Sequence, residues 1–261
     1  WMPLAMRRFR RLSRIPGPVR VTARGLSTVP RHVAVIMDGN RRYGQKTVGN
    51  KLKGHAEGGQ RLHDCVRWCL DTGVQHLSAF AFSTENWKRT PVEINYLMRL
   101  FTTKLEEIKE IALKEGVAVR LCASDKDRLP AHVQRSFEDL EATTASANPP
   151  LTLNLCVSYG GQGEILQAAR RLVTEAREGR WNERDVEVDL TEAEFESRLS
   201  YPVSVDLVIR TSGELRLSNF LLWQTAYAEL IFLNKLWPEI SREDWDLCLE
   251  DYASRKRRFG E

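Results

Sequence analysis

The 261-residue sequence contains no apolar run near the ~18 residues that a membrane-spanning helix requires. Its five cysteines form no CxxC pair and have no histidine at zinc-ligand spacing, which favours buried, reduced thiols over disulfides or a zinc site. The glycine-rich turn at 158–164 lacks the GxGxxG spacing of a dinucleotide-binding loop and indicates a tight strand-to-helix connection instead. With 42% apolar and 28% charged residues, the composition is typical of a globular protein with a substantial core.

Acidic residues are absent from positions 1–31, which carry eight arginines. The net charge of +4 for the whole chain therefore leaves −4 for residues 32–261, and this mildly acidic body argues against a nucleic-acid-binding protein. The segment is broken by Pro16, Gly17 and Pro18 and lacks the apolar core of a secretory signal, which predicts an organellar transit peptide. A disordered basic tail is the alternative. We divide the chain into this extension, 1–31, and a folded domain, 32–261.

From residue 32 onward, apolar runs alternate with stretches of helical periodicity. The expected strands are 33–37, 76–82, 117–123, 151–157, 205–210 and 229–233. The expected helices are 54–73, 91–115, 130–147, 162–178, 191–199 and 242–257. This alternation predicts a single α/β domain with a mostly parallel, six-stranded sheet flanked by helices.

The most informative segment is DGNRR (38–42), which directly follows the apolar run 33–37. Such a run predicts a buried parallel strand, and in open α/β sheets ligands bind at the carboxyl ends of the strands. A carboxylate beside two guanidinium groups suits a site that holds a metal ion and phosphate oxygens together. An Asp-Gly-Asn turn with two solvated arginines is the alternative interpretation.

Further cationic and polar clusters fall where predicted strands end or helices begin. They are KLKGH (51–55), FSTENWKR (82–89), RTSGELRLSNF (210–220) and the basic tail RKRRFG (255–260). Arginine forks match phosphate oxygens in a bidentate way, and two diphosphates carry about six negative charges. The set therefore predicts capacity for two diphosphate ligands with one Mg²⁺, although a surface salt bridge is the simpler interpretation for any single arginine.

The helix expected over 91–115 carries one long apolar stripe. Thr90 and Glu93 form its capping signal, Pro91 occupies the first helical position, and Gly116 ends it. The stripe consists of Ile94, Leu97, Met98, Phe101, Leu105, Ile108 and Ala112. It is typical of a core-facing helix but also fits one wall of an elongated apolar groove, and the sequence leaves both interpretations open.

Together these segments resemble the cis-prenyltransferase family, whose bacterial members are undecaprenyl diphosphate synthases. The matching motifs are HVAVIMDGNRR (32–42), GH (54–55), AFSTENWKR (81–89), SYGG (158–161), DLVIRTSGELRLSNFLLWQTAYAEL (206–230) and LWPE (236–239). The resemblance runs from about residue 31 to residue 260. It implies the family's fold, in which the sheet and helices enclose an elongated apolar groove, and it makes 32–261 a catalytic domain.

The resemblance also implies roles for individual residues. Asp38 matches the essential carboxylate that positions Mg²⁺ on a diphosphate, and Glu229 matches a second acidic group near the metal. The pocket for the diphosphate of the allylic primer matches Gly39, Asn40, Arg42, Tyr43, Lys51 and His55. The isopentenyl diphosphate site matches Arg210, Arg216 and Ser218. The loop that organises both substrates matches Ser83, Asn86, Trp87 and Arg89, of which we expect Ser83, Asn86 and Arg89 to be catalytic. Arg258 and Gly260 match a terminal Arg-x-Gly motif that reaches the neighbouring subunit's site.

The reaction implied is a Mg²⁺-dependent, sequential condensation of isopentenyl diphosphate with an allylic diphosphate. The primer is geranyl, farnesyl or geranylgeranyl diphosphate, the product is a Z-polyprenyl diphosphate, and diphosphate is released. The proton acceptor stays open between a diphosphate oxygen and a group near Asn86. The intact Asp38 and Arg-x-Gly motifs favour a self-sufficient homodimer, with no nucleic-acid partner. A protein without a spanning segment can still associate peripherally with a membrane through such a product.

Several positions depart from the bacterial pattern. Arg41 replaces a glycine and Tyr43 a tryptophan, and with Ser212 they resemble eukaryotic members. Lys51 keeps the charge of an arginine but loses its bidentate fork, so we expect weaker primer binding. Gln162 stands where many relatives have arginine.

Three other functions compete with this one. A non-catalytic accessory subunit would share the fold but typically lacks the first motif, which is intact here at 38–40. A phosphohydrolase with an aspartate nucleophile needs a second aspartate two residues later, and position 40 is asparagine. A basic interaction module is supported only by residues 1–31.

The transit-like extension favours a plastid location, with the mitochondrion or the endoplasmic-reticulum surface as alternatives.

Overall fold

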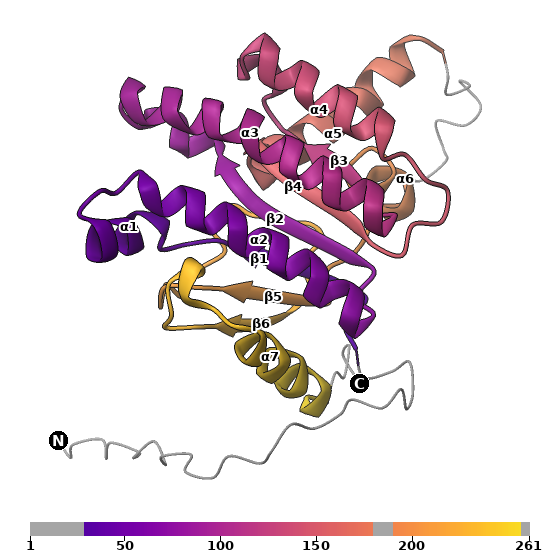
Figure 1. Cartoon of the computed structure of the whole chain (residues 1–261). Helices are drawn as coiled ribbons and strands as arrows, with labels where there is room; N and C mark the ends of the chain where they lie inside the picture. The colour runs from indigo at the N-terminus through magenta and orange to yellow at the C-terminus, as the bar shows by residue number, and fades with distance from the viewer. Residues whose placement is uncertain (1–28, 180–189, 257–261) are drawn as a thin grey trace, which may run out of the picture.

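A computed structural model describes residues 29–179 and 190–256. Its centre is a six-stranded sheet in the order β3-β4-β2-β1-β5-β6, in which every neighbouring pair is parallel (Figure 1). The strands are β1 (His32–Ile36), β2 (His76–Ser83), β3 (Ala118–Cys122), β4 (Thr152–Tyr159), β5 (Leu207–Arg210) and β6 (Glu229–Phe232). The predicted single α/β domain with a parallel sheet is confirmed.

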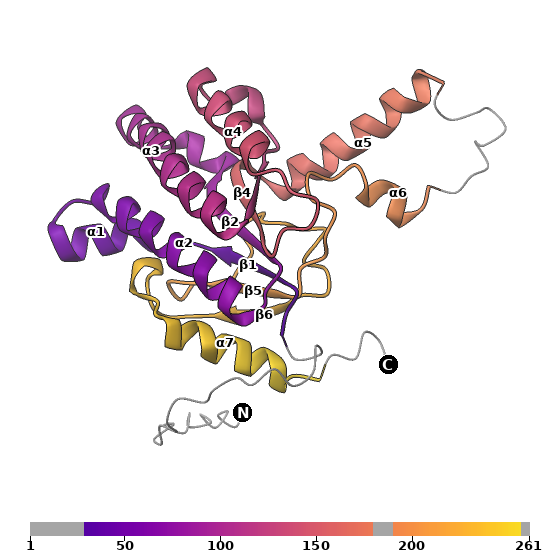
Figure 2. The same ribbon diagram turned by 45° about the vertical axis from the view of Figure 1, so that its right-hand side comes forward.

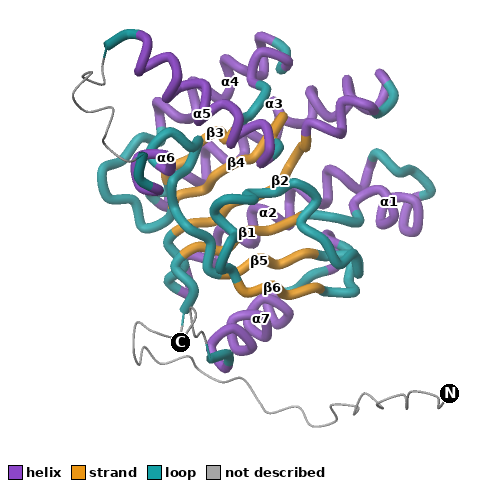
Figure 3. The backbone as a smooth tube through the Cα atoms, turned by 180° about the vertical axis from the view of Figure 1, so that it is seen from behind, coloured by secondary structure: helices purple, strands orange, loops and turns teal. Residues whose placement is uncertain are grey.

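Helices lie on both sides of this sheet. They are α1 (Asn40–Val48), α2 (Lys53–Thr72), α3 (Pro91–Glu115), α4 (Ala131–Thr143), α5 (Gly161–Arg177), α6 (Glu192–Glu196) and α7 (Arg242–Ser254). Helices α2, α3 and α4 lie on one face, α7 runs beside the β6 edge, and α5 extends away from the sheet (Figure 2). Viewed from behind, the opposite face is crossed by long loops (Figure 3). No helix in the described ranges is long and apolar enough to cross a membrane.

The continuous apolar run of β1 reflects burial on both faces of the sheet. Val33 and Val35 pack into the larger core with α2 and α3. Ala34 and Ile36 point to the other face and pack into a second cluster with Phe220 and its neighbours. Successive residues of a strand alternate between faces, so only a strand covered on both sides reads as an uninterrupted apolar run.

Helix α1 was not predicted, because residues 38–42 were interpreted only as a turn or a site. It is strongly polar, with Tyr43 and Val48 as its only large apolar residues and Gly44 as its only buried one, so no apolar stripe stands out in the sequence. Gly39 and Gly49, both with positive φ, stand at its two ends. The other expected helices are present with ends shifted by a few residues, most clearly α6, which is shorter than 191–199.

The predicted state of the cysteines agrees with the structure, in which all five are buried and unbridged. The extension 1–31 falls almost wholly outside the described residues, as do Arg258 and Gly260 of the terminal motif.

Candidate active site

Two pockets open side by side at the carboxyl end of the sheet. The first has a volume of about 590 Å³ and is lined by Met37, Asp38, Gly39, Asn40, Arg41, Arg42, Gln45, Lys46, Lys51, His55 and Arg89. The second, of about 570 Å³, is lined by Ile36, Met37, Asp38, Asn40, His55, Phe80, Ala81, Ser83, Glu85, Asn86, Arg89, Arg210, Ser218 and Asn219. Asp38, Asn40, His55 and Arg89 line both, so segments far apart in the sequence share one site.

An apolar groove meets both pockets at Met37, Asn40 and His55. It holds about 80 Å³ and runs between α2 and α3 over β2 and β4. Its further lining is Gly58, Gly59, Leu62, Ala81, Leu97, Leu100, Phe101, Lys104, Leu105, Ile108, Phe137, Leu155, Val157 and Trp237. The apolar stripe of α3 is therefore both part of the core and one wall of the groove, so both interpretations that the sequence left open hold.

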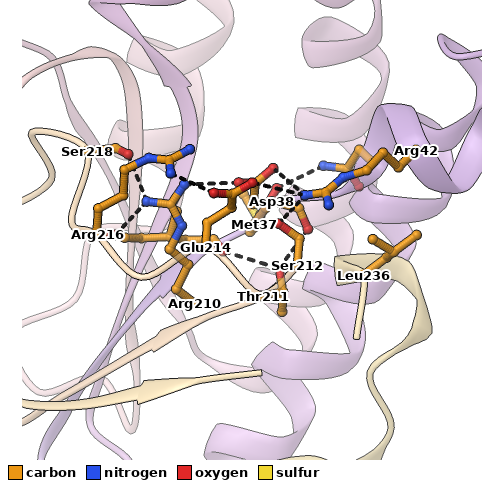
Figure 4. Close-up of polar contacts among 12 residues, drawn as sticks. Met37, Asp38, Arg42, Arg210, Thr211, Ser212, Glu214, Arg216, Ser218 and Leu236 are labelled. Carbon is orange, nitrogen blue, oxygen red and sulfur yellow. Dashed lines mark hydrogen bonds and ion pairs between the residues drawn. The ribbon is translucent and has the colours of Figure 1, made fainter. Parts of the chain in front are cut away.

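Asp38 lies at the boundary between the pockets. Its Oδ2 accepts a hydrogen bond of 3.0 Å from Arg210, and its Oδ1 lies 3.9 Å from an Arg42 nitrogen (Figure 4). The backbone is fixed as well, because the Asp38 carbonyl accepts bonds from the Thr211 hydroxyl (2.7 Å) and the Trp237 amide (2.9 Å). A carboxylate held this firmly keeps one geometry relative to both pockets.

Gly39 is required by its conformation and by its surroundings. Its φ is +104°, a region that side chains disfavour. A Cβ placed there would lie 2.9 Å from the side chain of Leu236 and 3.1 Å from its Cα. Gly39 therefore connects β1 to α1 at a position where Leu236 leaves no space for a side chain.

Arg210 is the most buried cation of the site, at 3% exposure. One terminal nitrogen donates to the Ser218 hydroxyl (2.7 Å) and to the Arg216 carbonyl, while the other contacts Asp38 (Figure 4). Its Nε is buried without a hydrogen-bond partner in the described structure. A buried guanidinium with spare donor capacity beside a pocket is suited to binding an anion.

Arg42 contacts a different segment of the same loop. It donates to the hydroxyl of Ser212 and lies 3.9 Å from a Glu214 oxygen. Ser212 adopts a positive φ of 77°, one of five such non-glycine residues in the described ranges. Arg42 is about half exposed, so its guanidinium can reach a ligand in the first pocket.

The loop after β2 forms the short 3₁₀ segment η1 (Thr84–Lys88). Ser83 and Asn86 form a reciprocal capping box, in which the Asn86 side chain accepts from the Ser83 amide at 3.1 Å. Trp87 points away from the pockets, since its indole N–H donates to the Ser158 hydroxyl at 2.8 Å and its ring packs against Phe82. The loop thus presents Ser83 and Asn86 to the second pocket, anchored by Trp87 behind them.

Sequence reasoning missed a buried acid that organises two cations. Glu93, in the first turn of α3, is 7% exposed. It accepts a hydrogen bond of 3.0 Å from Arg89 and lies 3.7 Å from the Arg41 Nε. The sequence identifies Glu93 only as part of a helix cap, although its position four residues after Arg89 is a signal for an i,i+4 ion pair. Burial lowers the pKa of Arg89, partly offset by Glu93.

His55 is electrically neutral at physiological pH. Burial, with Arg89 and Arg41 nearby, lowers its pKa to about 4. Its Nε2 is buried and has no hydrogen-bond partner in the described structure. A neutral imidazole in this position can donate one hydrogen bond to a ligand without adding charge.

Within the chain, Glu229 lies away from Asp38. Within the sheet, Glu229 pairs with Leu207, which pairs with Val33 at the start of β1. At a rise of about 3.3 Å per residue, Glu229 is therefore roughly 15 Å from the level of Asp38 along the strands. Its carboxylate binds Arg255 at 2.7 Å instead. A single chain does not bring Glu229 and Asp38 to one metal site, because β6 begins where β1 begins.

Three other predicted residues lie outside the pocket walls described above. Arg216 is largely exposed and its guanidinium pairs with Glu214 at 2.6 Å, although its carbonyl supports Arg210. Tyr43 lies half-buried on α1, and the side chain of Trp87, a residue of η1, is directed towards Ser158. In the described structure none of these three residues lines either pocket.

The residues present fit a Mg²⁺ ion bound jointly with a ligand. In the described ranges no group of three or more acidic, histidine or cysteine side chains could enclose a metal. Mg²⁺ in phosphate-binding sites is commonly held by one or two carboxylates together with phosphate oxygens and waters. Asp38, about one-third exposed and open to both pockets, can supply that carboxylate.

The fold and the site define a parallel α/β protein with two adjoining cationic pockets and an apolar groove. A family model described as undecaprenyl diphosphate synthase matches residues 36–260. An isoprenyl transferase of Thermotoga maritima is 42% identical over 234 residues, which cover 89% of this chain and 97% of that protein. A (2E,6E)-farnesyl-diphosphate-specific undecaprenyl-diphosphate synthase of Xanthomonas campestris is 42% identical, covering 90% of this chain and 89% of that protein.

A solved structure supports the same assignment. Lavandulyl diphosphate synthase from Lavandula x intermedia, in complex with dimethylallyl diphosphate, superposes with a TM-score of 0.82 at 32% identity, covering 90% of this chain and 99% of that one. The chain belongs to the cis-prenyltransferase family. It is a transferase of the polyprenyl diphosphate synthase type.

Proposed function

We propose that this enzyme elongates an allylic diphosphate with isopentenyl diphosphate in a Mg²⁺-dependent reaction and forms cis double bonds. The observation that carries the proposal is the junction of three spaces: two cationic pockets share Asp38, and an apolar groove opens at Met37, Asn40 and His55. The two cationic pockets suit two diphosphates, and the apolar lining of the groove suits a growing hydrocarbon.

The first pocket binds the diphosphate of the allylic primer. Arg42, Lys51 and Arg89 supply cations around it, and the neutral His55 supplies a hydrogen bond. Its opening into the groove lets the prenyl tail lie between α2 and α3. The second pocket binds isopentenyl diphosphate through Arg210 and Ser218, next to Ser83 and Asn86.

Placing both substrates side by side accounts for the chemistry. The cationic residues of the first pocket stabilise the charge that develops on the departing diphosphate as the allylic C–O bond breaks. Mg²⁺, held by Asp38 and substrate oxygens, would act as a Lewis acid on that diphosphate. Isopentenyl diphosphate, oriented by Arg210, attacks the allylic carbon through its double bond, and loss of a proton leaves the new double bond.

The test is elongation by a protein that begins near Ser27. It is incubated with labelled isopentenyl diphosphate, Mg²⁺ and, in parallel, geranyl, farnesyl or geranylgeranyl diphosphate. Chromatography of the extracted products gives primer choice and chain length. Loss of elongation on chelation of Mg²⁺ supports the proposal. A protein that elongates none of the primers but forms a complex with a second, active subunit would instead be an accessory subunit.

Assembly and location complete the proposal, and both rest on the sequence. We propose a homodimer, because the terminal motif with Arg258 and Gly260 resembles one that reaches a neighbouring subunit. Size-exclusion chromatography showing an active monomer would contradict it.

We propose a plastid address from the composition of residues 1–31, and a fluorescent fusion of residues 2–31 that stays in the cytosol would contradict that.

A further inference from the structure

Asn219 joins three segments at the wall of the second pocket. Its Oδ1 accepts a hydrogen bond of 2.9 Å from the backbone amide of Gln162, and its Nδ2 donates to a Glu85 carboxylate oxygen at 3.1 Å. Its carbonyl accepts a third bond, of 2.7 Å, from the Gly161 amide. The loop after β5, the start of α5 and η1 therefore meet at this one residue.

Helix α5 depends on this contact for its N-terminal amides. The first amides of a helix lack intrahelical partners, and the N-cap of α5, Gly160, has no side chain to cap them. Asn219, from another loop, provides acceptors for two of these amides, those of Gly161 and Gln162. The packing is tight, since a Cβ on Gly160 would lie 2.7 Å from the Asn219 Nδ2 and 2.8 Å from the Thr84 hydroxyl.

The backbone at this position is strained in a way that orients the anion site. Ser218 and Asn219 adopt consecutive positive φ values of 51° and 66°. Asparagine tolerates this region better than most residues, and strained backbone persists only where surrounding contacts hold it. The neighbouring Ser218 hydroxyl accepts from Arg210, so the turn fixes the Ser218–Arg210 pair.

We propose that Asn219 is a positioning residue for the second pocket, which sets the affinity for isopentenyl diphosphate by holding Ser218 and Arg210 against η1. The inference rests on the proposed function of that pocket. Asn219 acts through its neighbours: it fixes the loop after β5 on one side and Glu85 on the other. The first pocket does not include Asn219, so primer binding should be nearly independent of it.

The first experiment separates the two substrates. In steady-state elongation by the full chain, Asn219→Ala should raise the KM for isopentenyl diphosphate about tenfold, because it removes both side-chain hydrogen bonds, with the Gln162 backbone amide and with Glu85. The KM for the primer should change less than about twofold, because the loss does not reach the first pocket. Asn219→Gly, which retains freedom at positive φ, should give the same split. An unchanged KM for isopentenyl diphosphate, or an equal rise in both constants, would overturn the proposal.

A second experiment reverses the polarity of the contact. Asn219→Asp retains the acceptor for Gln162 but places a carboxylate beside Glu85, and it should be the worst single variant. Adding Glu85→Gln supplies a new donor, so the KM of the double variant for isopentenyl diphosphate should lie within about threefold of the KM of Glu85→Gln alone. A double variant no better than Asn219→Asp would refute the role of this pair.

The matched control is Gln167→Ala on the same helix. It removes a hydrogen bond of 2.7 Å that the Gln167 side-chain amide donates to the Ser124 carbonyl. This bond lies outside both pockets, so both KM values should stay unchanged. Thermal midpoints of all variants identify any loss of fold. Failure of the proposed function would appear as a wild type that does not elongate, whereas failure of this inference would appear as variants with unchanged constants in an active wild-type background.

Discussion

The carboxylate of Asp38 and the guanidinium of Arg210 are joined by a hydrogen bond of 3.0 Å across 172 positions of sequence. They meet because β1 and β5 are neighbours in the sheet and Ile36 pairs with Arg210 at the end of the register. Arg210 is buried and fixed by Ser218, whereas about a third of the Asp38 side chain stays exposed. The pair therefore combines a rigid cation with a carboxylate that is open to ligands.

Replacing Asp38 should abolish most of the activity without unfolding the protein. We expect Asp38→Asn, which keeps the shape but not the charge, to lower Mg²⁺-dependent turnover by at least about 100-fold. Turnover is measured with labelled isopentenyl diphosphate, and the fold by circular dichroism. The matched control, Asp139→Asn, removes an exposed carboxylate that pairs with Lys109 and should retain wild-type turnover. An Asp38→Asn variant of near wild-type rate would contradict the assignment.

Gly39→Ala should destabilise the fold as well as the site. The added Cβ meets Leu236 at 2.9 Å in a backbone region of φ +104°, so we expect a loss of at least about 2 kcal/mol in the free energy of unfolding. Gly49→Ala is the control, because its φ of +64° carries strain but nothing lies within 4 Å; about 1 kcal/mol is expected. Urea unfolding measures both, and equal losses would show that Leu236 does not matter.

Stability should fall between pH 7 and pH 5 because of His32. Burial, assisted by the nearby His76, lowers the pKa of His32 to about 4 from its ordinary value of 6.5. The unfolded chain therefore binds a proton in this window that the folded chain does not, and stability decreases as the pH falls. The expected loss from His32 is about 2 kcal/mol at pH 5 relative to pH 7.

Urea unfolding at several pH values tests the prediction for His32. The Nε2 of His32 lies 2.7 Å from the Ser78 hydroxyl in the buried core, so its replacement removes a specific titrating group. His32→Asn should reduce the pH dependence between 7 and 5 by the contribution of His32 and leave the rest, because burial also lowers the pKa values of His55 and His76 to about 4. The variant also lowers stability overall. His132→Asn, on the exposed surface of α4, should leave the dependence as in the wild type. An unchanged slope in His32→Asn would refute the assignment.

Ile108 should influence product length if the groove holds the growing chain. It lines the groove and also a small cavity of about 10 Å³ beyond it, next to His63 and Leu153. Ile108→Ala opens one space into the other, so products should shift towards longer chains, at a stability loss of about 2–5 kcal/mol. Leu113→Ala, on the same helix but 54% exposed, is the control. An unchanged product distribution from folded Ile108→Ala would exclude this part of the groove.

The local patterns of the chain determined much of this protein. The apolar runs gave the strands, because a strand buried on both faces needs an uninterrupted run, as in Val33 to Ile36. Capping chemistry set the start of α3, where the Thr90 hydroxyl accepts from the Glu93 amide. The order and spacing of the motifs from HVAVIMDGNRR to LWPE predicted the family, which the comparisons confirm.

Only the tertiary structure decided which of these residues share a site. Sheet order and register place Asp38 beside Arg210 but Glu229 at the other end of the strands, and no local pattern encodes register between strands that are distant in sequence. Helix α1 escaped detection because it is too polar to show an apolar stripe and buries only one glycine. The hydrogen bonds of the Asn219 side chain and the ion pair between Arg41 and Glu93 are long-range contacts, and each residue alone is indistinguishable from an ordinary polar residue. The sequence by itself determined the elements and the chemistry at their ends, whereas packing of parallel strands determined which ends form the site.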